Sequence, residues 1–289
     1  MTTVAIVGAG DIGGACAQAL ASRDRVSRIL AIDAAVNAAA GKALDIQQAG
    51  AIAGFHTRLD ATADESRVVG AAVVVVADRF AAGSPEWQGG SPEWQGEEGL
   101  ALIKRIAAFA ADASIVFAGA RQSDLIEASS QEARIAARRL IGSATEALAA
   151  AVAGIVAMEA GCAADEVSVA VLGTPPASFV LPWSDASIGG YALERVLSQV
   201  QLRRIEARVG KLWPLGPYAL GTAAARIVEA VVGASRRSYN VLTMLGGEFG
   251  VRNRVGTVPA LLSSSGIVHT RVPALNTRER VQLETALGV

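Results

Sequence analysis

Histidine and cysteine are scarce in this chain of 289 residues. The only histidines are His56 and His269, and the only cysteines are Cys16 and Cys162. Two cysteines cannot build a disulfide framework, which indicates a reducing compartment and predicts a cytoplasmic protein. Because all four residues are scattered along the chain, the sequence also argues against a His/Cys zinc site, and we expect no bound metal.

Excess charge and long apolar runs are also lacking. The 26 basic residues balance the 27 acidic ones, so no net field attracts nucleic acid. The run Ala147–Met158 is shorter than the roughly 20 apolar residues of a membrane-spanning helix. No basic segment of the kind that opens a signal peptide follows Met1. We therefore expect a soluble protein with neither nucleic-acid nor membrane partners.

A glycine-rich loop follows the first apolar run of the chain. Thr3–Val7 is typical of a buried parallel strand, and it leads into Gly8-Ala9-Gly10-Asp11-Ile12-Gly13 and then an alanine-rich helical stretch. In the G-x-G-x-x-G motif, the first glycine allows a tight turn, the second lets a pyrophosphate approach and the third lets the helix pack closely. The phosphates lie at the helix N-terminus, where free N–H groups favour an anion.

An acidic residue stands where this motif needs one. The predicted strand Arg28–Ile32 ends at Asp33, about 20 residues after the loop, where a carboxylate accepts the ribose 2′-hydroxyl of NAD. The sequence thus predicts NAD as a small-molecule ligand. The predicted contacts are Gly8, Gly10, Asp11, Ile12, Gly13 and Asp33. The alternative interpretation is that the fold alone requires the glycines, whether or not NAD binds.

Strands and helices alternate through the rest of the first half. Further strands are expected at Thr57–Leu59, Ala71–Ala77 and Ala113–Ala118, with a helix at Gly99–Ala111. Such alternation predicts an α/β fold built on a Rossmann-type, doubly wound parallel sheet.

Several longer motifs resemble the lactate/malate dehydrogenase family, especially its bacterial malate dehydrogenases. The matching segments are GAGDIGG at Gly8–Gly14, GKALDI at Gly41–Ile46, RLIGSATEALAAAVAGIVAMEAG at Arg139–Gly161 and VPALNTRERVQLETAL at Val272–Leu287. The resemblance implies an NAD domain over residues 1–142 and an α+β substrate domain over residues 143–289. It also implies hydride transfer between 2-hydroxy and 2-oxo acids, and a homo-oligomer, either a dimer or a tetramer.

The catalytic residues that this resemblance implies are replaced. The family's catalytic histidine follows a substrate-domain strand, expected here at Val167–Leu172, and its position falls on Pro175 or Pro176. The aspartate that orients the histidine maps onto Leu148, and the arginine that binds the substrate carboxylate maps onto Ala151. An asparagine pair after the fifth strand becomes Gly119-Ala120. Proline, leucine and alanine side chains can neither accept a proton nor bind an anion.

Two arginines could replace part of this set. Arg79 and Arg121 follow the fourth and fifth strands, so both are expected near the crevice, where they could contact an anion. Asp78 and Asp124, their neighbours, could equally neutralise them. Glu146 could also line the crevice.

A seven-residue segment is duplicated between the fourth strand and the next helix. GSPEWQG at Gly83–Gly89 recurs unchanged at Gly90–Gly96, so that Trp87 and Trp94 occupy equivalent positions. The tryptophans could cover the crevice or contact a partner. The alternative interpretation, which we favour, is a polar loop whose prolines form turns.

Three hypotheses for the function follow. The first, which the replaced positions favour, is a non-catalytic protein that retains an NAD-binding fold. The second is a structural or regulatory subunit of an oligomer. The third is an NAD-dependent oxidoreductase of the malate/lactate dehydrogenase type with an altered substrate and a rebuilt site.

Overall fold

The fold is known from a computed structural model, which describes residues 2–81 and 92–288. Within these ranges, one twisted sheet runs through the molecule and is parallel in its N-terminal part. In spatial order, its parallel strands are β3 (Arg58–Thr62), β2 (Arg28–Ile32), β1 (Thr3–Val7), β4 (Val73–Val76), β5 (Ser114–Phe117) and β6 (Leu140–Gly142). The order 3-2-1-4-5-6 confirms the predicted Rossmann-type sheet.

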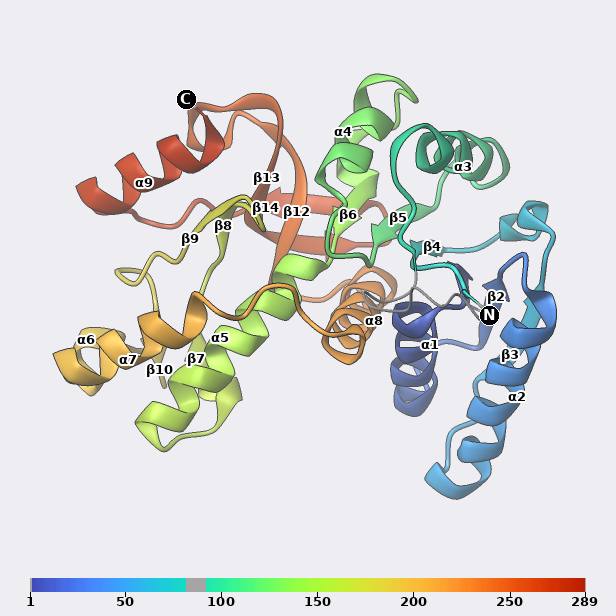
Figure 1. Cartoon of the computed structure of the whole chain (residues 1–289), viewed down its shortest axis with the longest axis horizontal. Coiled ribbons are helices and arrows are strands. Elements are labelled where there is room, and N and C mark those ends of the chain that lie inside the picture. The colour runs from blue at the N-terminus through green and yellow to red at the C-terminus, as the bar shows by residue number, and fades with distance from the viewer. Residues whose placement is uncertain (1, 82–91, 289) are drawn as a thin grey trace.

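Helices cover both faces of the parallel sheet (Figure 1). The helices of the first half are α1 (Asp11–Arg23), α2 (Val36–Ala53), α3 (Gly96–Phe109) and α4 (Ser123–Gln131). At the centre of the sheet both faces must be apolar, so β4 is a continuous run of four valines, all of them buried. The first copy of the duplicated segment, which contains Trp87, lies outside the described residues.

The second half continues the same sheet with antiparallel strands. Beyond β6 lie β12 (Ser238–Gly246), β13 (Arg252–Ser263), β8 (Leu172–Thr174) and β9 (Ser178–Val180), with β14 (Gly266–Thr270) paired to β13. A small second sheet contains β7 (Val167–Ser168), β10 (Ser187–Ile188) and β11 (Tyr191–Ala192). The helices are α5 (Ala144–Ala160), α6 (Leu193–Val196), α7 (Gln199–Val209), α8 (Pro217–Gly233) and α9 (Thr277–Leu287). The division at residue 142 stays a prediction.

The single strand expected at Val167–Leu172 is wrong. The segment divides into β7, in the small sheet, and β8, in the large one. Between them, the Asn240 side chain accepts a hydrogen bond from Val171 N–H (2.9 Å) and donates one to the Val169 carbonyl (3.4 Å). A side chain distant in sequence therefore replaces ladder hydrogen bonds and ends both strands.

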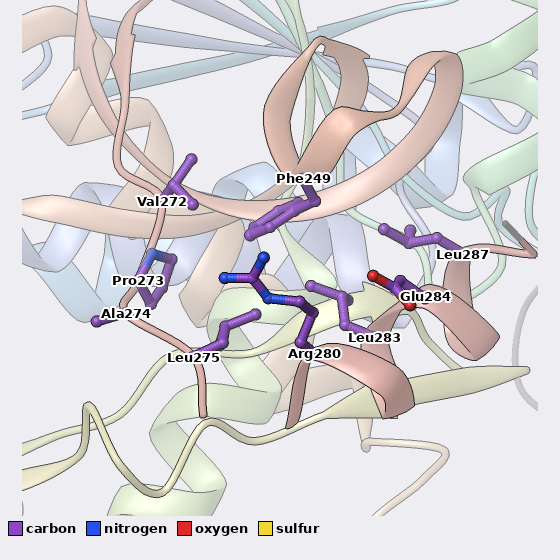
Figure 2. Close-up of a pocket in the computed structure, with 9 residues that line it drawn as sticks. All are labelled: Phe249, Val272, Pro273, Ala274, Leu275, Arg280, Leu283, Glu284 and Leu287. Carbon is purple, nitrogen blue, oxygen red and sulfur yellow. The ribbon is translucent and has the colours of Figure 1, made fainter. Parts of the chain in front are cut away.

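A cavity of about 400 Å³ lies beside α9, the last helix. Figure 2 shows the Arg280 guanidinium pointing toward Phe249 among the apolar side chains of Leu275 and Leu283. The cavity shares no lining residue with the crevice at the carboxyl ends of the parallel strands. It is therefore separate from the site that the sequence predicts.

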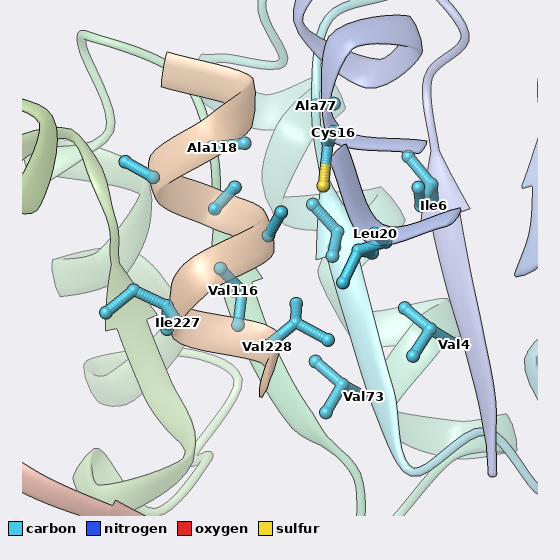
Figure 3. Close-up of a cluster of buried hydrophobic side chains, with 14 of the residues drawn as sticks. Val4, Ile6, Cys16, Leu20, Val73, Ala77, Val116, Ala118, Ile227 and Val228 are labelled. Carbon is cyan, nitrogen blue, oxygen red and sulfur yellow. The ribbon is translucent and has the colours of Figure 1, made fainter. Parts of the chain in front are cut away.

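Helix α8 of the second half packs directly against α1. Figure 3 shows Cys16 and Leu20 of α1 and Val228 of α8 in one buried cluster beside Val73 of β4. A Cβ atom on Gly221 of α8 would lie 2.6 Å from Ala15 Cβ, so the two helices meet where α8 has no side chain. None of the helices in the described ranges combines the length and apolar character needed to cross a membrane.

Candidate functional site

The candidate site is a crevice of about 420 Å³ at the carboxyl ends of the parallel strands. It lies between the first turn of α1, the segments after β4 and β5, and the segment leading into α8. Residues that line it include Asp11, Ile12, Asp78, Glu93, Ala120 and Arg121. Open α/β sheets bind their ligands at this edge, where the order of the strands reverses.

The glycine loop is compressed against its surroundings. A Cβ atom on Gly13 would lie 2.0 Å from the Gly8 carbonyl oxygen, so α1 packs against β1 at a distance that only glycine permits. Gly8 has φ +105°, a conformation that side chains rarely adopt. A Cβ atom on Gly10 would lie 2.4 Å from Asp78 Oδ2. The group that approaches Gly10 closely is thus a carboxylate of the chain itself.

The first three N–H groups of α1 all donate to the side chain of Asp78. The N···O distances are 2.8 Å from Asp11, 3.1 Å from Ile12 and 2.9 Å from Gly13. These N–H groups have no partner within the helix, and the positive end of the helix dipole adds to their attraction for an anion. The carboxylate of Asp78 therefore occupies the position at which the sequence predicts a pyrophosphate.

Asp78 is deeply enclosed, with 1% of its surface exposed. Burial raises the pKa of its carboxyl above the ordinary value of 3.8, and the hydrogen bonds from the α1 N–H groups oppose this shift. No lysine or arginine pairs with Asp78 among the described residues. The negative charge thus depends on backbone N–H groups, as a bound phosphate would.

Asp33 is also fully engaged by backbone groups. It directly follows β2 and accepts hydrogen bonds from Ala9 N–H (2.8 Å), Ala35 N–H (2.9 Å) and Phe80 N–H (2.9 Å). The residue is 7% exposed. The carboxylate predicted to hold a ribose therefore ties the glycine loop to the segment after β4.

Asp78, Arg79 and Phe80 together form a strap across the glycine loop. The Asp78 carboxylate attaches one end of the strap to α1, and the Phe80 N–H attaches the other end to Asp33. Lys42 Nζ lies 5.4 Å from the centre of the Phe80 ring and donates to the Gly10 carbonyl at 2.7 Å. The strap covers the two groups, the α1 N–H groups and Asp33, that the sequence assigns to NAD.

The predicted anion contacts have different surroundings. Arg79 donates to Glu98 of α3 at 2.7 Å, and its guanidinium stacks 4.6 Å above the Trp94 ring. The expectation that Asp78 neutralises Arg79 is wrong, because the Asp78 carboxylate is directed at α1. Arg121 lines the crevice and forms no ion pair within residues 2–81 and 92–288.

Glu93, from the second copy of the duplicated segment, engages the segment after β5. It accepts hydrogen bonds from Ala120 N–H (2.9 Å), Arg121 N–H (3.1 Å) and the Gln122 side chain (2.8 Å). A Cβ atom on Gly119 would lie 2.3 Å from Glu93 Oε2. The sequence reasoning missed this glutamate, because nothing in the repeat indicates which copy reaches the crevice.

Of the positions at which the resemblance places catalytic groups, Ala120 lines the crevice. Outside its lining lie Leu148, Ala151, Pro175 and Pro176. Leu148 is completely buried on α5, Ala151 is half-buried one turn later, and Pro175 and Pro176 form the turn between β8 and β9. His56, before β3, and His269, on β14, are both exposed. Among the described residues that line the crevice, none is a histidine.

Glu146, in the first turn of α5, faces the second half of the chain. It is 6% exposed, accepts a hydrogen bond from Asn240 N–H at 2.9 Å and lies 3.4 Å from the Arg226 guanidinium. Burial raises the pKa of the Glu146 carboxyl above its ordinary value of 4.5, while the hydrogen bond from Asn240 and nearby positive charges oppose the shift. Its role is to join α5, α8 and β12.

The stability of the Glu146→Gln variant, relative to that of the unmodified chain, is expected to increase as the pH rises. A raised pKa means that folding strengthens proton binding, so this contribution is complete below about pH 4.5 and is lost as the pH rises through the raised pKa. Glutamine is neutral at every pH, so the variant does not lose a stability contribution as the pH rises. Melting temperatures at about pH 5 and about pH 8 test this expectation. Exposed Glu132→Gln is the control, and a difference independent of pH would contradict the prediction.

Comparisons with known proteins agree with the fold. The family described as lactate/malate dehydrogenase, NAD binding domain, matches residues 2–115. Malate dehydrogenase from Thioalkalivibrio sulfidiphilus is 28% identical, over 100% of this chain and 97% of that protein. L-lactate dehydrogenase from Allorhizobium ampelinum is 27% identical, over 97% of this chain and 94% of that protein.

Solved structures resemble the whole chain. Malate dehydrogenase from Aeropyrum pernix superposes with a TM-score of 0.85 at 23% identity, covering 99% of this chain and 95% of that one. Malate dehydrogenase from Salinibacter ruber gives 0.86 at 21% identity, covering 99% and 94%. These structures establish a common fold for both halves.

The residues present match the types that NAD requires, but the groups that would hold the phosphates and the ribose are already engaged by the chain itself. The N–H groups of α1 form an anion cradle, and Asp33 stands at the end of β2, as a dinucleotide requires. Asp78 does not fit, because its carboxylate already holds the donors that the phosphates would use. The domain is thus of the NAD-binding type, with its phosphate position filled by its own side chain.

Proposed function

We propose that this chain is a non-catalytic member of the lactate/malate dehydrogenase family, one that keeps the NAD-binding fold without interconverting 2-hydroxy and 2-oxo acids. The observation that carries the proposal is the absence of a histidine and of a paired anion clamp among the described residues that line the crevice. Oxidation of a secondary alcohol needs a base for the hydroxyl proton and cationic groups for the substrate carboxylate.

Two carboxylates of the crevice, the buried Asp78 and the partly buried Glu93, cannot supply the missing base. Asp78 and Glu93 each accept three hydrogen bonds from other groups of the chain, so transferring a proton to either would disrupt the local structure. Asp11 is partly exposed at the crevice rim and lies 3.9 Å from Lys42, where solvent competes for it. A site without a positioned base forfeits roughly 10²–10⁴-fold in rate.

The proposal is tested by assays of NAD-linked turnover with malate, oxaloacetate, lactate and pyruvate. We expect no change in NADH absorbance above the blank, while the malate dehydrogenase of T. sulfidiphilus, assayed beside it, turns over. A rate that scales with protein concentration, and remains with the protein through a second purification step, would overturn the proposal.

One observation favours an oxidoreductase with a rebuilt site as the second candidate. Arg121 faces the crevice with no ion pair within the described residues, so it is available to an anionic substrate. Arg79, the other proposed anchor, is engaged by Glu98 and Trp94. If a wider screen of 2-oxo acids finds turnover, Arg121→Ala should abolish it.

Oligomeric state and location stay predictions. Trp94 packs partly buried against the core beside α3, so it does not form an exposed contact for a partner. Light scattering after size exclusion distinguishes a monomer from the proposed homo-oligomer. Both cysteines are free, as a cytoplasmic protein would have them.

A further inference from the structure

We propose that Asp78 is an internal competitor for the dinucleotide, so that NAD binds only when the strap Asp78–Phe80 leaves the glycine loop. The carboxylate holds all three leading N–H groups of α1, at 2.8–3.1 Å. A phosphate bound there would meet a second negative charge in the same cradle, and like charges in a shared enclosed site cannot both remain ionised at low cost. Asp78 and a pyrophosphate therefore exclude each other.

The ribose position is closed by the same three-residue segment. Phe80 N–H donates to Asp33 Oδ2, the oxygen that also accepts from Ala9 N–H. A ribose hydroxyl that bound Asp33 would have to replace or share this contact. Because Asp78 and Phe80 are two residues apart, movement of the strap frees the phosphate and ribose positions together.

The strap is also held from outside. Arg79 N–H donates to the Pro92 carbonyl at 3.0 Å, and the Arg79 side chain pairs with Glu98 of α3. The outward-facing contacts are more exposed than the inward-facing ones, since Asp78 and Asp33 are buried whereas the Glu98 side chain is 60% exposed. The inner contacts, and Asp78 above all, therefore decide whether the strap stays closed.

Isothermal titration with NAD⁺ and NADH tests this inference on the full-length chain. Asp78→Gly removes the competing carboxylate, and Asp78→Asn removes its charge while keeping its shape. Both variants are expected to bind the dinucleotide about tenfold more tightly than the unmodified chain, or better. Asp165→Asn, which removes a charge from an exposed site, is the matched control and should not alter affinity.

The outcomes separate this inference from the proposed function. If folded Asp78→Gly or Asp78→Asn binds NAD no more tightly than the unmodified chain, the inference is overturned. Far-UV circular dichroism reports folding, and Asp78→Asn decides alone if the glycine variant fails to fold.

The same samples are assayed for turnover of malate and lactate. Turnover would count against the non-catalytic proposal and leave the binding result standing, whereas tighter binding without turnover supports both.

Discussion

Replacing Gly13 by alanine is expected to lower the free energy of unfolding by about 3 kcal/mol, whereas the same change at neighbouring Gly14 should raise it by up to about 1 kcal/mol. The Gly13 Cβ would lie 2.0 Å from the Gly8 carbonyl oxygen, a backbone atom that can move only if β1 and α1 separate. At Gly14 the nearest atoms belong to the flexible Lys42 side chain, at 3.5 Å. There, alanine only improves helix propensity.

Urea denaturation of the two variants measures this difference. Since both substitutions add one methyl group to the same helix, their contrast isolates the contact between α1 and the glycine loop. Equal stabilities for the two alanine variants would show that the helix shifts to accept a Gly13 side chain. The close packing in the structure would then be unnecessary for folding.

The second large effect is expected at Asp33. Asp33→Ala should cost about 2–4 kcal/mol of unfolding free energy, because it removes the acceptor of three backbone N–H groups in an enclosed position. The exposed Asp60 pairs with Arg28 at 2.7 Å, and its side chain is 52% exposed. Removal of that carboxylate should cost less than about 1 kcal/mol.

Chemical denaturation of both aspartate variants makes the comparison. A loss at Asp33 no larger than at Asp60 would mean that the three N–H groups find water or other partners easily. The carboxylate would then be free for a ligand. The expected loss instead assigns Asp33 a structural role, in addition to the ribose contact that its position predicts.

Local patterns explain why much of the fold could be predicted. The β-branched run Thr3–Val7, the glycine spacing and Asp33 are features of adjacent residues, and they placed β1, α1 and β2 correctly. The alternation of strands and helices predicts that the sheet is parallel. Interactions between distant residues were inaccessible, as the division of Val167–Leu172 by Asn240 illustrates.

The candidate site shows the same limit. The sequence places Asp78 directly after the fourth strand and beside Arg79, which it could equally neutralise. The direction of the side chain depends on α1, which lies more than 60 residues earlier in the chain. The signal available in the sequence is the carboxylate of Asp78 directly after a buried strand, in a chain that also carries a glycine loop.

The contact of α8 with α1 bears on how any ligand could enter the crevice. Gly221 brings α8 so close to α1 that a Cβ atom there would lie 2.7 Å from the Ile12 carbonyl oxygen, at the start of the glycine-loop helix. Rotation of one half of the chain against the other would have to break this tight junction. The rate at which NAD enters the crevice is therefore expected to be set by the opening of the strap Asp78–Phe80, and not by a hinge motion between the two halves of the chain.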